Sequence, residues 1–187
     1  MKAVIDTSSL VSLVRYYLPF DKEEKLKAFV EERIESKKLI VLEQVGAECK
    51  LQGKGQVVKA LPFIDKPKNK TAVTDVPVNK KLYNMVDNNF INGSVAGMLP
   101  PAEYQLERDK FMKSADFAMV LYAYSVKDKE EVVIVTEETG YSNDSKPFRK
   151  IPGICKTVGV RTLNLPKFLA ENSIIDLTVE LQKTSLF

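Results

Sequence analysis

The sequence predicts an α/β fold in which helices cover both faces of a parallel sheet. Apolar runs such as residues 39–42 (LIVL) and 132–135 (VVIV) lack the apolar-polar alternation of a sheet with one face in water. Amphipathic segments with helical spacing separate these runs. The chain has 187 residues, 44% of them hydrophobic, which is enough to build the core of such a fold.

The first half of the chain is expected to alternate strands with helices. Asp21 and Glu24 are spaced as a capping box, which predicts a helix start, and Gly53 and Gly55 predict a helix end. The expected elements are a strand at 2–5, a helix at 21–38, a strand at 39–42, a helix at 43–52 and a loop-rich insertion at 54–76.

The second half is expected to be mostly helical. Residues 114–126 carry an apolar stripe at helical spacing, whereas residues 93–101 contain two glycines and two prolines and predict a loop. The expected elements are helices at 78–90, 103–112, 114–126 and 151–158, strands at 132–135 and 160–163, and one or two closing helices from residue 165. We take residues 1–187 as a single domain with a basic insertion at about 54–112.

The chain contains no histidine and only two cysteines, Cys49 and Cys155. Ser-His-Asp and Cys-His catalysis and imidazole-based zinc sites are therefore excluded within this chain. The working groups of an enzyme would be carboxylates, hydroxyls, lysine, tyrosine or a bound metal. The cysteines lack CxxC spacing, so we expect two buried free thiols, although one long-range disulfide also fits the sequence.

The N-terminus lacks the apolar run and the cleavage site of a signal peptide. No segment approaches the roughly 20 apolar residues of a membrane span. We therefore expect a cytoplasmic protein with no membrane contact.

The positive charge is concentrated in one segment. The net charge of the whole chain is +3, yet residues 50–81 hold eight lysines against Asp65 and Asp75. A basic segment beside an acidic remainder suits a polyanion such as a nucleic acid. A solvated lysine-rich loop explains the same pattern equally well.

Several acids stand where predicted strands end. Asp6 follows the first strand, Glu137 and Glu138 follow VVIV, Glu48 lies in the helix after LIVL, and Asp116 opens the helix before VVIV. In open parallel sheets, ligands bind at the carboxyl ends of the strands.

Each acid also has a simpler structural explanation. Asp6 or Ser9 could be a helix N-cap, Asp116 a first-turn acid, Glu48 a solvated side chain, and the glutamates plain turn residues.

Taken together, the acids indicate a cation. Four converging carboxylates would raise one another's pKa values unless a positive charge joined them. Oxygen ligands favour hard divalent ions such as Mg²⁺ or Mn²⁺, and the chemistry of these ions needs no imidazole.

These residues resemble, in order, the four acidic motifs of PIN-domain nucleases, and more specifically the DUF4411 branch. That branch shows a Tyr-Tyr-x-Pro-Phe element and an Ile-Pro-x-x-Cys element, and the similarity extends to Leu169. The matching segments are Ile5-Asp6-Thr7-Ser8, Val45-x-x-Glu48, Ala115-Asp116, Val135-Thr136-Glu137-Glu138, Tyr16 to Phe20, and Ile151, Pro152 and Cys155.

The resemblance implies a three-layer α/β/α sandwich with a five-stranded parallel sheet and a nuclease that cleaves RNA with Mg²⁺ or Mn²⁺. It also implies the toxin of a bacterial or phage toxin–antitoxin pair, with a cognate antitoxin as partner. PIN proteins often dimerise, so a homodimer is a further expectation. The rival readings are a PIN fold that binds RNA or protein without catalysis, and a structure-specific DNA nuclease.

The resemblance assigns roles to individual residues. The expected catalytic and metal-binding residues are Asp6, Glu48, Asp116 and Glu138. The expected supporting residues are Thr7, Thr136, Glu137, Asp144 and Glu43. Separately from the resemblance, the basic segment offers Lys50, Lys54 and Lys59 as the expected RNA-binding residues. The fourth acid of the family is an aspartate, so Glu137, Glu138 and Asp144 stay open for that place, and Glu43 competes with Glu48 for the second.

Overall fold

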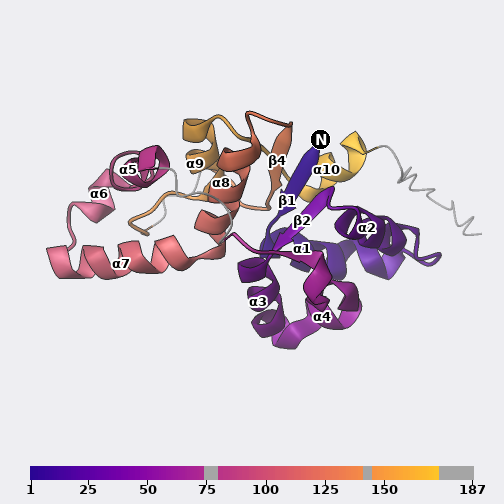
Figure 1. Ribbon diagram of the computed structural model, residues 1–187. Coiled ribbons are helices and arrows are strands. Elements are labelled where there is room, and N and C mark those ends of the chain that lie inside the picture. The colour runs from indigo at the N-terminus through magenta and orange to yellow at the C-terminus, as the bar shows by residue number, and fades with distance from the viewer. Residues whose placement is uncertain (74–79, 141–144, 173–187) are drawn as a thin grey trace, which may run out of the picture.

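A computed structural model describes residues 1–73, 80–140 and 145–172, and it contains a five-stranded sheet whose paired strands all run parallel (Figure 1). The strand order is β3-β2-β1-β4-β5. The strands are β1 (Lys2–Ile5), β2 (Leu39–Leu42), β3 (Lys70–Thr71), β4 (Val132–Val135) and β5 (Arg161–Leu163). This architecture confirms the predicted α/β fold with a five-stranded parallel sheet, and the flanking helices fit a three-layer sandwich.

The centre of the sheet is the point where the direction of winding reverses. From β1 the chain adds β2 and β3 on one side, and it then returns to add β4 and β5 on the other. Val4 pairs with Ile134 and Ile5 pairs with Val135, so β1 and β4 end side by side. A crevice opens beyond such a reversal, because the connections after the two strands lead away from each other.

Helices cover both faces of the sheet (Figure 1). The ends of α2 (Lys25–Glu35) and α10 (Leu165–Glu171) are joined by a 2.7 Å hydrogen bond from Arg33 to the side-chain oxygen of Asn172. On the other face lie α8 (Ala115–Val126) and α9 (Ile151–Val158). The buried residues of these helices pack against strands that are themselves fully buried, such as β2 and β4. The expected helix at 114–126 and the expected strands at 2–5, 39–42 and 132–135 are confirmed.

Shorter elements surround the carboxyl edge of the sheet. After β1, α1 (Thr7–Ser12) continues into a π-helical turn (Leu13–Tyr17) and a 3-10 turn (Leu18–Phe20). After β2 comes α3 (Glu43–Leu51), which ends close to the predicted helix end and is followed by a 3-10 turn (Gln52–Gly55).

The expected insertion is more ordered than its composition suggested. It contains α4 (Gln56–Ala60), 3-10 turns at Pro62–Asp65 and Pro67–Asn69, and the edge strand β3. It continues through α5 (Lys80–Asn88), α6 (Gly93–Ala96) and α7 (Pro101–Lys113), which extend away from the sheet in Figure 1. The expectation of a loop-rich segment was therefore wrong for residues 56–71, and the expectation of a loop at 93–101 was wrong for residues 93–96. Two polar strand residues and a four-residue helix carry no periodic apolar signal that a sequence pattern could reveal.

The predicted capping box of the second helix was also wrong. The helix begins at Lys25, and Glu24 stands before it with a left-handed φ of 54°. Asp21 still stabilises the helix start, because its carboxylate accepts hydrogen bonds from the backbone amides of Leu26 and Lys27 at 3.1 and 2.9 Å. A short turn between Asp21 and the helix separates the cap from the first helical residue.

The other predicted helices and strands agree closely with the described part of the structure. The helix predicted at 103–112 begins two residues earlier, and the strand predicted at 160–163 begins one residue later. Residues 78 and 79 of the expected helix at 78–90, and the closing segment after residue 172, lie outside the described residues.

Candidate active site

Asp6 lies where β1 ends, and two hydroxyl groups hold its carboxylate. The residue is buried, with 6% of its surface exposed. Its Oδ2 atom accepts hydrogen bonds from Ser8 Oγ at 2.5 Å and from Thr136 Oγ1 at 2.9 Å. Asp6 occupies the N-cap position of α1, yet its side chain makes no capping bond. The simple N-cap explanation of Asp6 therefore fails, and its carboxylate bridges the ends of two neighbouring strands.

Thr136 and Ser8 each join the ends of β1 and β4, Thr136 by donating to Asp6 and Ser8 by accepting from Glu137. Thr136 Oγ1 also accepts from the backbone amide of Glu138 at 3.2 Å, and Ser8 Oγ accepts from the amide of Glu137 at 3.2 Å. These bonds use both the donor and an acceptor site of each hydroxyl. The turn after β4 is thereby fixed relative to Asp6.

Glu48 joins this edge from α3. The Thr7 hydroxyl, which is buried, donates to Glu48 Oε2 at 2.6 Å. Glu43 is exposed at the first position of α3 and lies outside this hydrogen-bond network. Of the two glutamates that the sequence left open, the structure brings Glu48 to the strand ends.

Glu137 and Glu138 are neighbours with different surroundings. Glu137 Oε1 accepts from the backbone amide of Leu165 at 2.7 Å and from Ser9 Oγ at 3.3 Å. These bonds fix the start of α10, where the helix dipole also favours a negative charge. Glu137 therefore has a structural role, because its carboxylate binds the first residue of α10.

Glu138 faces the other way, toward α9. Its Oε2 atom accepts from the backbone amide of Ile151 at 2.9 Å, so the Ile-Pro-x-x-Cys element positions this acid. Cys155, the last residue of that element, is buried, and burial followed by the charge of Glu138 raises the pKa of its thiol to about 12. The third candidate for this position, Asp144, lies outside the described residues.

The charges of the other acids affect the pKa of Asp116. It lies in the first turn of α8, but the cap of that helix is Ser114, whose hydroxyl accepts from the amide of Phe117 at 3.2 Å. The pKa of Asp116 is raised to about 7, first by burial and then by the charges of Glu138, Asp6 and Glu48, while the charge of Lys146 acts in the opposite sense. Negative charge at this edge therefore raises the pKa of Asp116 in spite of the opposing charge of Lys146.

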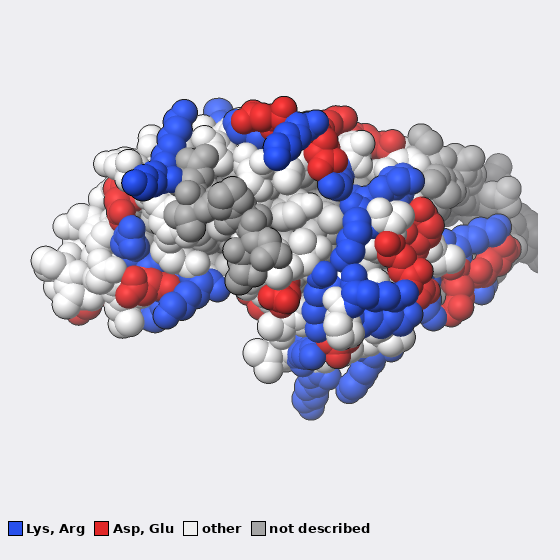
Figure 2. Space-filling model, in the orientation of Figure 1, with Lys and Arg blue, Asp and Glu red and all other residues white. Residues whose placement is uncertain are grey.

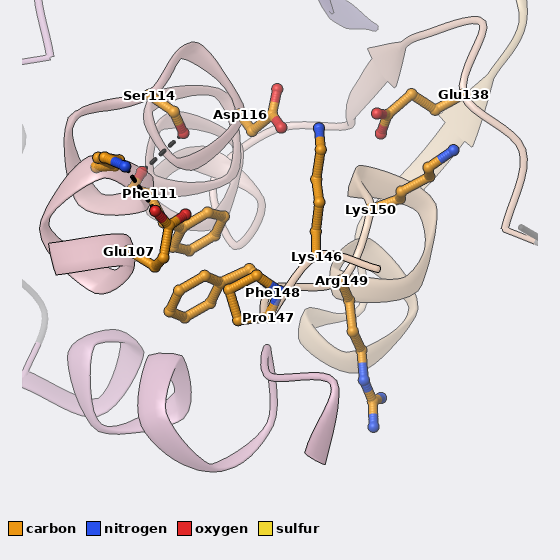
Figure 3. Close-up of a pocket in the computed structure, with 11 residues that line it drawn as sticks. Glu107, Phe111, Ser114, Asp116, Glu138, Lys146, Pro147, Phe148, Arg149 and Lys150 are labelled. Atoms are coloured by element: carbon orange, nitrogen blue, oxygen red, sulfur yellow. Dashed lines mark hydrogen bonds and ion pairs between the residues drawn. The ribbon is translucent and has the colours of Figure 1, made fainter. Parts of the chain in front are cut away.

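A cleft opens between Asp116 and Glu138 (Figure 3). Its volume is about 260 Å³. In the view of Figure 3 the ammonium group of Lys146 points up between the two carboxylates. The residues that line the cleft are Glu107, Lys110, Phe111, Ser114, Asp116, Glu138, Lys146, Pro147, Phe148, Arg149 and Lys150.

The chemistry of these side chains suits a hard divalent cation. Asp6, Glu48, Asp116 and Glu138 offer only oxygen atoms, and the raised pKa of Asp116 shows that positive charge would be favourable here. Across the described ranges, no three of these acidic groups stand close enough together to form a ready ligand shell. The four acids thus share one edge and one electrostatic field.

The lysines expected to bind RNA differ in whether an acid neutralises them. Lys50 forms an ion pair with Asp65 at 2.8 Å, and Lys70 pairs with the same carboxylate. Lys54 and Lys59 are exposed, and neither forms an ion pair within residues 1–73. Lysines and acids are interleaved over this side of the molecule in Figure 2. Much of the positive charge counted in the sequence is therefore neutralised locally.

Sequence reasoning missed three site residues, namely Ser8, Ser9 and Lys146. The two serines follow Asp6 in an unbroken run of hydroxyl residues, which was a usable signal for a hydrogen-bond network. Lys146 gave no signal, because only the fold brings it to an acid 30 positions earlier in the chain.

A family model described as a domain of unknown function, DUF4411, matches residues 4–175. The chain belongs to this family. Neither the curated proteins nor the solved structures contain a match to the chain. The match in this DUF4411 protein runs from β1 past α10, so it includes every acid at the carboxyl edge.

Two further expectations can be compared with the structure. Both cysteines are buried and free, as predicted. Burial together with the charges of Glu48 and Asp6 raises the pKa of Cys49 to about 12.

Among the helices that the structure describes, none has the length and apolarity needed to cross a membrane.

Proposed function

We propose that this DUF4411 protein is a PIN-type nuclease that hydrolyses phosphodiester bonds of RNA with Mg²⁺ or Mn²⁺. The observation that carries the proposal is the electrostatic coupling of Asp116 to Glu138, Asp6 and Glu48, at the sheet edge beside the reversal point between β1 and β4. A ligand site is expected there in an open parallel sheet. The absence of histidine is consistent with this chemistry, which relies on carboxylates and a metal.

Each residue has a distinct task in this proposal. Asp6 and Asp116 would hold the principal ion, and Glu48 and Glu138 would complete its surroundings. When bound, the ion supplies positive charge for the phosphate and lowers the pKa of a water molecule. Thr136 keeps Asp6 oriented through its 2.9 Å hydrogen bond. Outer contacts of this kind commonly contribute about 10- to 100-fold to metal affinity or activity.

The direct test compares acids inside and outside the cleft. Asp6→Asn and Asp116→Asn should each lower cleavage of single-stranded RNA with Mn²⁺ by about 100-fold or more. Asp128→Asn, which changes an exposed acid beyond α8, should leave the rate unchanged. Full activity of Asp116→Asn would contradict the proposal. Parallel digestion of single-stranded RNA, single-stranded DNA and a flap duplex distinguishes RNA cleavage from structure-specific DNA cleavage.

A second candidate is a PIN-like protein that binds RNA without cleaving it. It is favoured by the hydrogen bonds that Glu137 and Glu138 already make to the amides of Leu165 and Ile151. Calorimetric titration with Mn²⁺ separates the two candidates. Binding that Asp116→Asn abolishes supports the nuclease, and an absence of binding at millimolar metal supports the second candidate.

The resemblance to PIN proteins further leads us to propose a toxin role with a cognate antitoxin, and a homodimer as the oligomeric form. Expression of the wild-type chain should arrest bacterial growth, and Asp116→Asn should relieve the arrest. Arrest by both chains would separate toxicity from the acidic site. Light scattering of the purified protein tests the homodimer directly.

A further inference from the structure

The cleft beside Asp116 and Glu138 has walls that the proposed chemistry leaves unused. One wall is apolar and consists of Phe111, Pro147 and Phe148. A second contains cationic side chains from α7 and from residues 146–150. Asp116 and Glu138 lie at the end of the cleft opposite the aromatic rings in Figure 3.

The insertion holds the apolar wall rigidly. Phe111 and Phe148 stack with ring centroids 4.4 Å apart and an interplanar angle of 4°, and Tyr104 stacks on Phe148 at 6.1 Å. The Tyr104 hydroxyl and the Arg108 guanidinium both donate to Asp87, which ties α7 to α5. The two phenylalanines are almost buried, at 8% and 7% exposed, so only a small part of each side chain is available where it lines the cleft.

The segment carrying the cationic side chains is also anchored. The amide of Asn92 donates to the Pro147 carbonyl at 2.7 Å, and the amide of Arg149 donates to the Phe90 carbonyl at 2.7 Å. Ile91 and Phe148 form the antiparallel bridge between these two bonds. A wall fixed before binding loses little conformational entropy when a ligand arrives.

Lys146 is the cation best placed for a ligand. Lys110 is paired with Glu107 at 2.6 Å, and Arg149 Nε donates to the Ile91 carbonyl and points away from the acids. Lys146 is exposed, reaches toward Asp116, and makes no hydrogen bond or ion pair with residues 80–140 or 145–172.

We propose that this cleft, if the protein is the nuclease described above, binds one unpaired ribonucleotide next to the bond that is hydrolysed. The base packs against Phe111, Pro147 and Phe148, and Lys146 contacts its phosphate. A single unstacked base can enter a cleft of about 260 Å³, whereas a base held in a duplex cannot leave its stack without an unpairing cost.

The test measures binding without cleavage. Fluorescein-labelled heptauridylate and a blunt RNA duplex of equal length are titrated in EDTA and followed by anisotropy over several salt concentrations. We expect the single strand to bind about tenfold more tightly than the duplex. Lys146→Ala should weaken single-strand binding about fivefold and reduce the salt slope by about 0.7, the value for one phosphate contact.

Two further variants locate the effect. Lys156→Ala removes an exposed lysine of α9 outside the cleft, so it should change neither affinity nor slope. Phe148→Leu should weaken single-strand binding and leave the salt slope unchanged, because it removes apolar contact and no charge. Circular dichroism checks that Phe148→Leu is folded, and the Lys146→Ala result decides the question if it is not.

The possible outcomes distinguish failure of the nucleotide subsite from failure of the proposed nuclease function. Equal binding of single strand and duplex, or equal effects of Lys146→Ala and Lys156→Ala, would overturn the nucleotide subsite even if RNA is cleaved with Mn²⁺. Cleft-dependent single-strand binding without cleavage at any metal concentration would uphold the subsite and overturn the nuclease.

Discussion

Two charged regions of this protein differ in how their charges are balanced. Around β3, Lys66 and Lys68 pair with Glu31 and Glu35 of α2 at 3.3 and 3.0 Å. At the carboxyl edge of β1 and β4, four acids lie within electrostatic reach of one another, and burial with their mutual repulsion raises the pKa of Asp116. The number of charges in a segment therefore says little about function. What matters is whether the fold leaves those charges unbalanced.

The largest expected effect contrasts the adjacent acids Glu138 and Glu137. Glu138→Gln should lower RNA cleavage by about 100-fold, because Glu138 faces Asp116 across the cleft. Glu137→Gln should change it by less than about threefold, because Glu137 fixes α10 and the glutamine keeps an acceptor oxygen. Rates measured on equal amounts of folded protein test the contrast. Equal losses would assign both acids to the same site.

The next effect concerns stability and pH. The pKa of Asp116 is about 7 in the fold and near 3.8 ordinarily, so the folded state holds a proton that the unfolded state releases between these values. Stability should fall as the pH rises from about 4 to 7 and stay low above that, a loss of up to about 4 kcal/mol. Asp116→Asn should therefore stabilise the metal-free protein at pH 8.

This stability difference has its own control. At about pH 3, below the ordinary pKa of 3.8, the side chain at position 116 is mostly neutral in the folded and unfolded states of both proteins, so their free energies of unfolding in urea should agree. Mn²⁺ at pH 8 should raise the stability of the wild type and leave Asp116→Asn nearly unchanged. A destabilised variant at pH 8 would show that the charges at this edge are already balanced.

A smaller effect is expected at Thr136. Thr136→Val keeps the shape of the side chain but removes the donor to Asp6 and the acceptor for the Glu138 amide. Loss of these buried bonds should cost about 1–3 kcal/mol in the free energy of unfolding and lower cleavage about tenfold. Thr162→Val on β5, outside this hydrogen-bond network, provides the matched control. Similar changes in both variants would remove Thr136 from the site.

The smallest effects belong to the lysines around β3. Lys66→Ala and Lys68→Ala break surface ion pairs, which contribute about 0–1 kcal/mol, and should not alter RNA affinity. Lys54→Ala and Lys59→Ala remove exposed charges and should weaken RNA binding by about two- to threefold at low salt. Anisotropy titrations of the four variants measure the difference. A larger effect from the paired lysines would place the RNA on the α2 side.

Much of the fold could be predicted because its signals are local. The buried strands read as unbroken apolar runs, and α8 shows a helical stripe, since periodicity depends on residues only a few positions apart. The two polar residues of β3 become a strand only because Val41 and Leu42 offer them a free edge. Asp21 caps its helix across a turn that the capping-box spacing does not describe.

The candidate site was predictable in part for a topological reason. Parallel strands end at the same edge of a sheet, so acids placed after strands converge there whatever the strand order. Which oxygen faces which neighbour could not be predicted. Glu137 and Glu138 are adjacent in sequence, yet one binds the start of α10 and the other the start of α9, because successive side chains of an extended turn point in opposite directions.

By itself, the sequence determined the buried central strands and the longer helices, the parallel α/β class, the exclusion of imidazole chemistry, and the acids that could meet at a sheet edge. Only the tertiary structure decided that β1 lies beside β4 and that Thr136 reaches Asp6 across 130 positions of chain. It also decided that Lys146 enters the cleft while the lysines around β3 are neutralised. Propensity and periodicity act over a few residues, whereas charge balance and hydrogen bonding depend on neighbours that only the complete fold supplies.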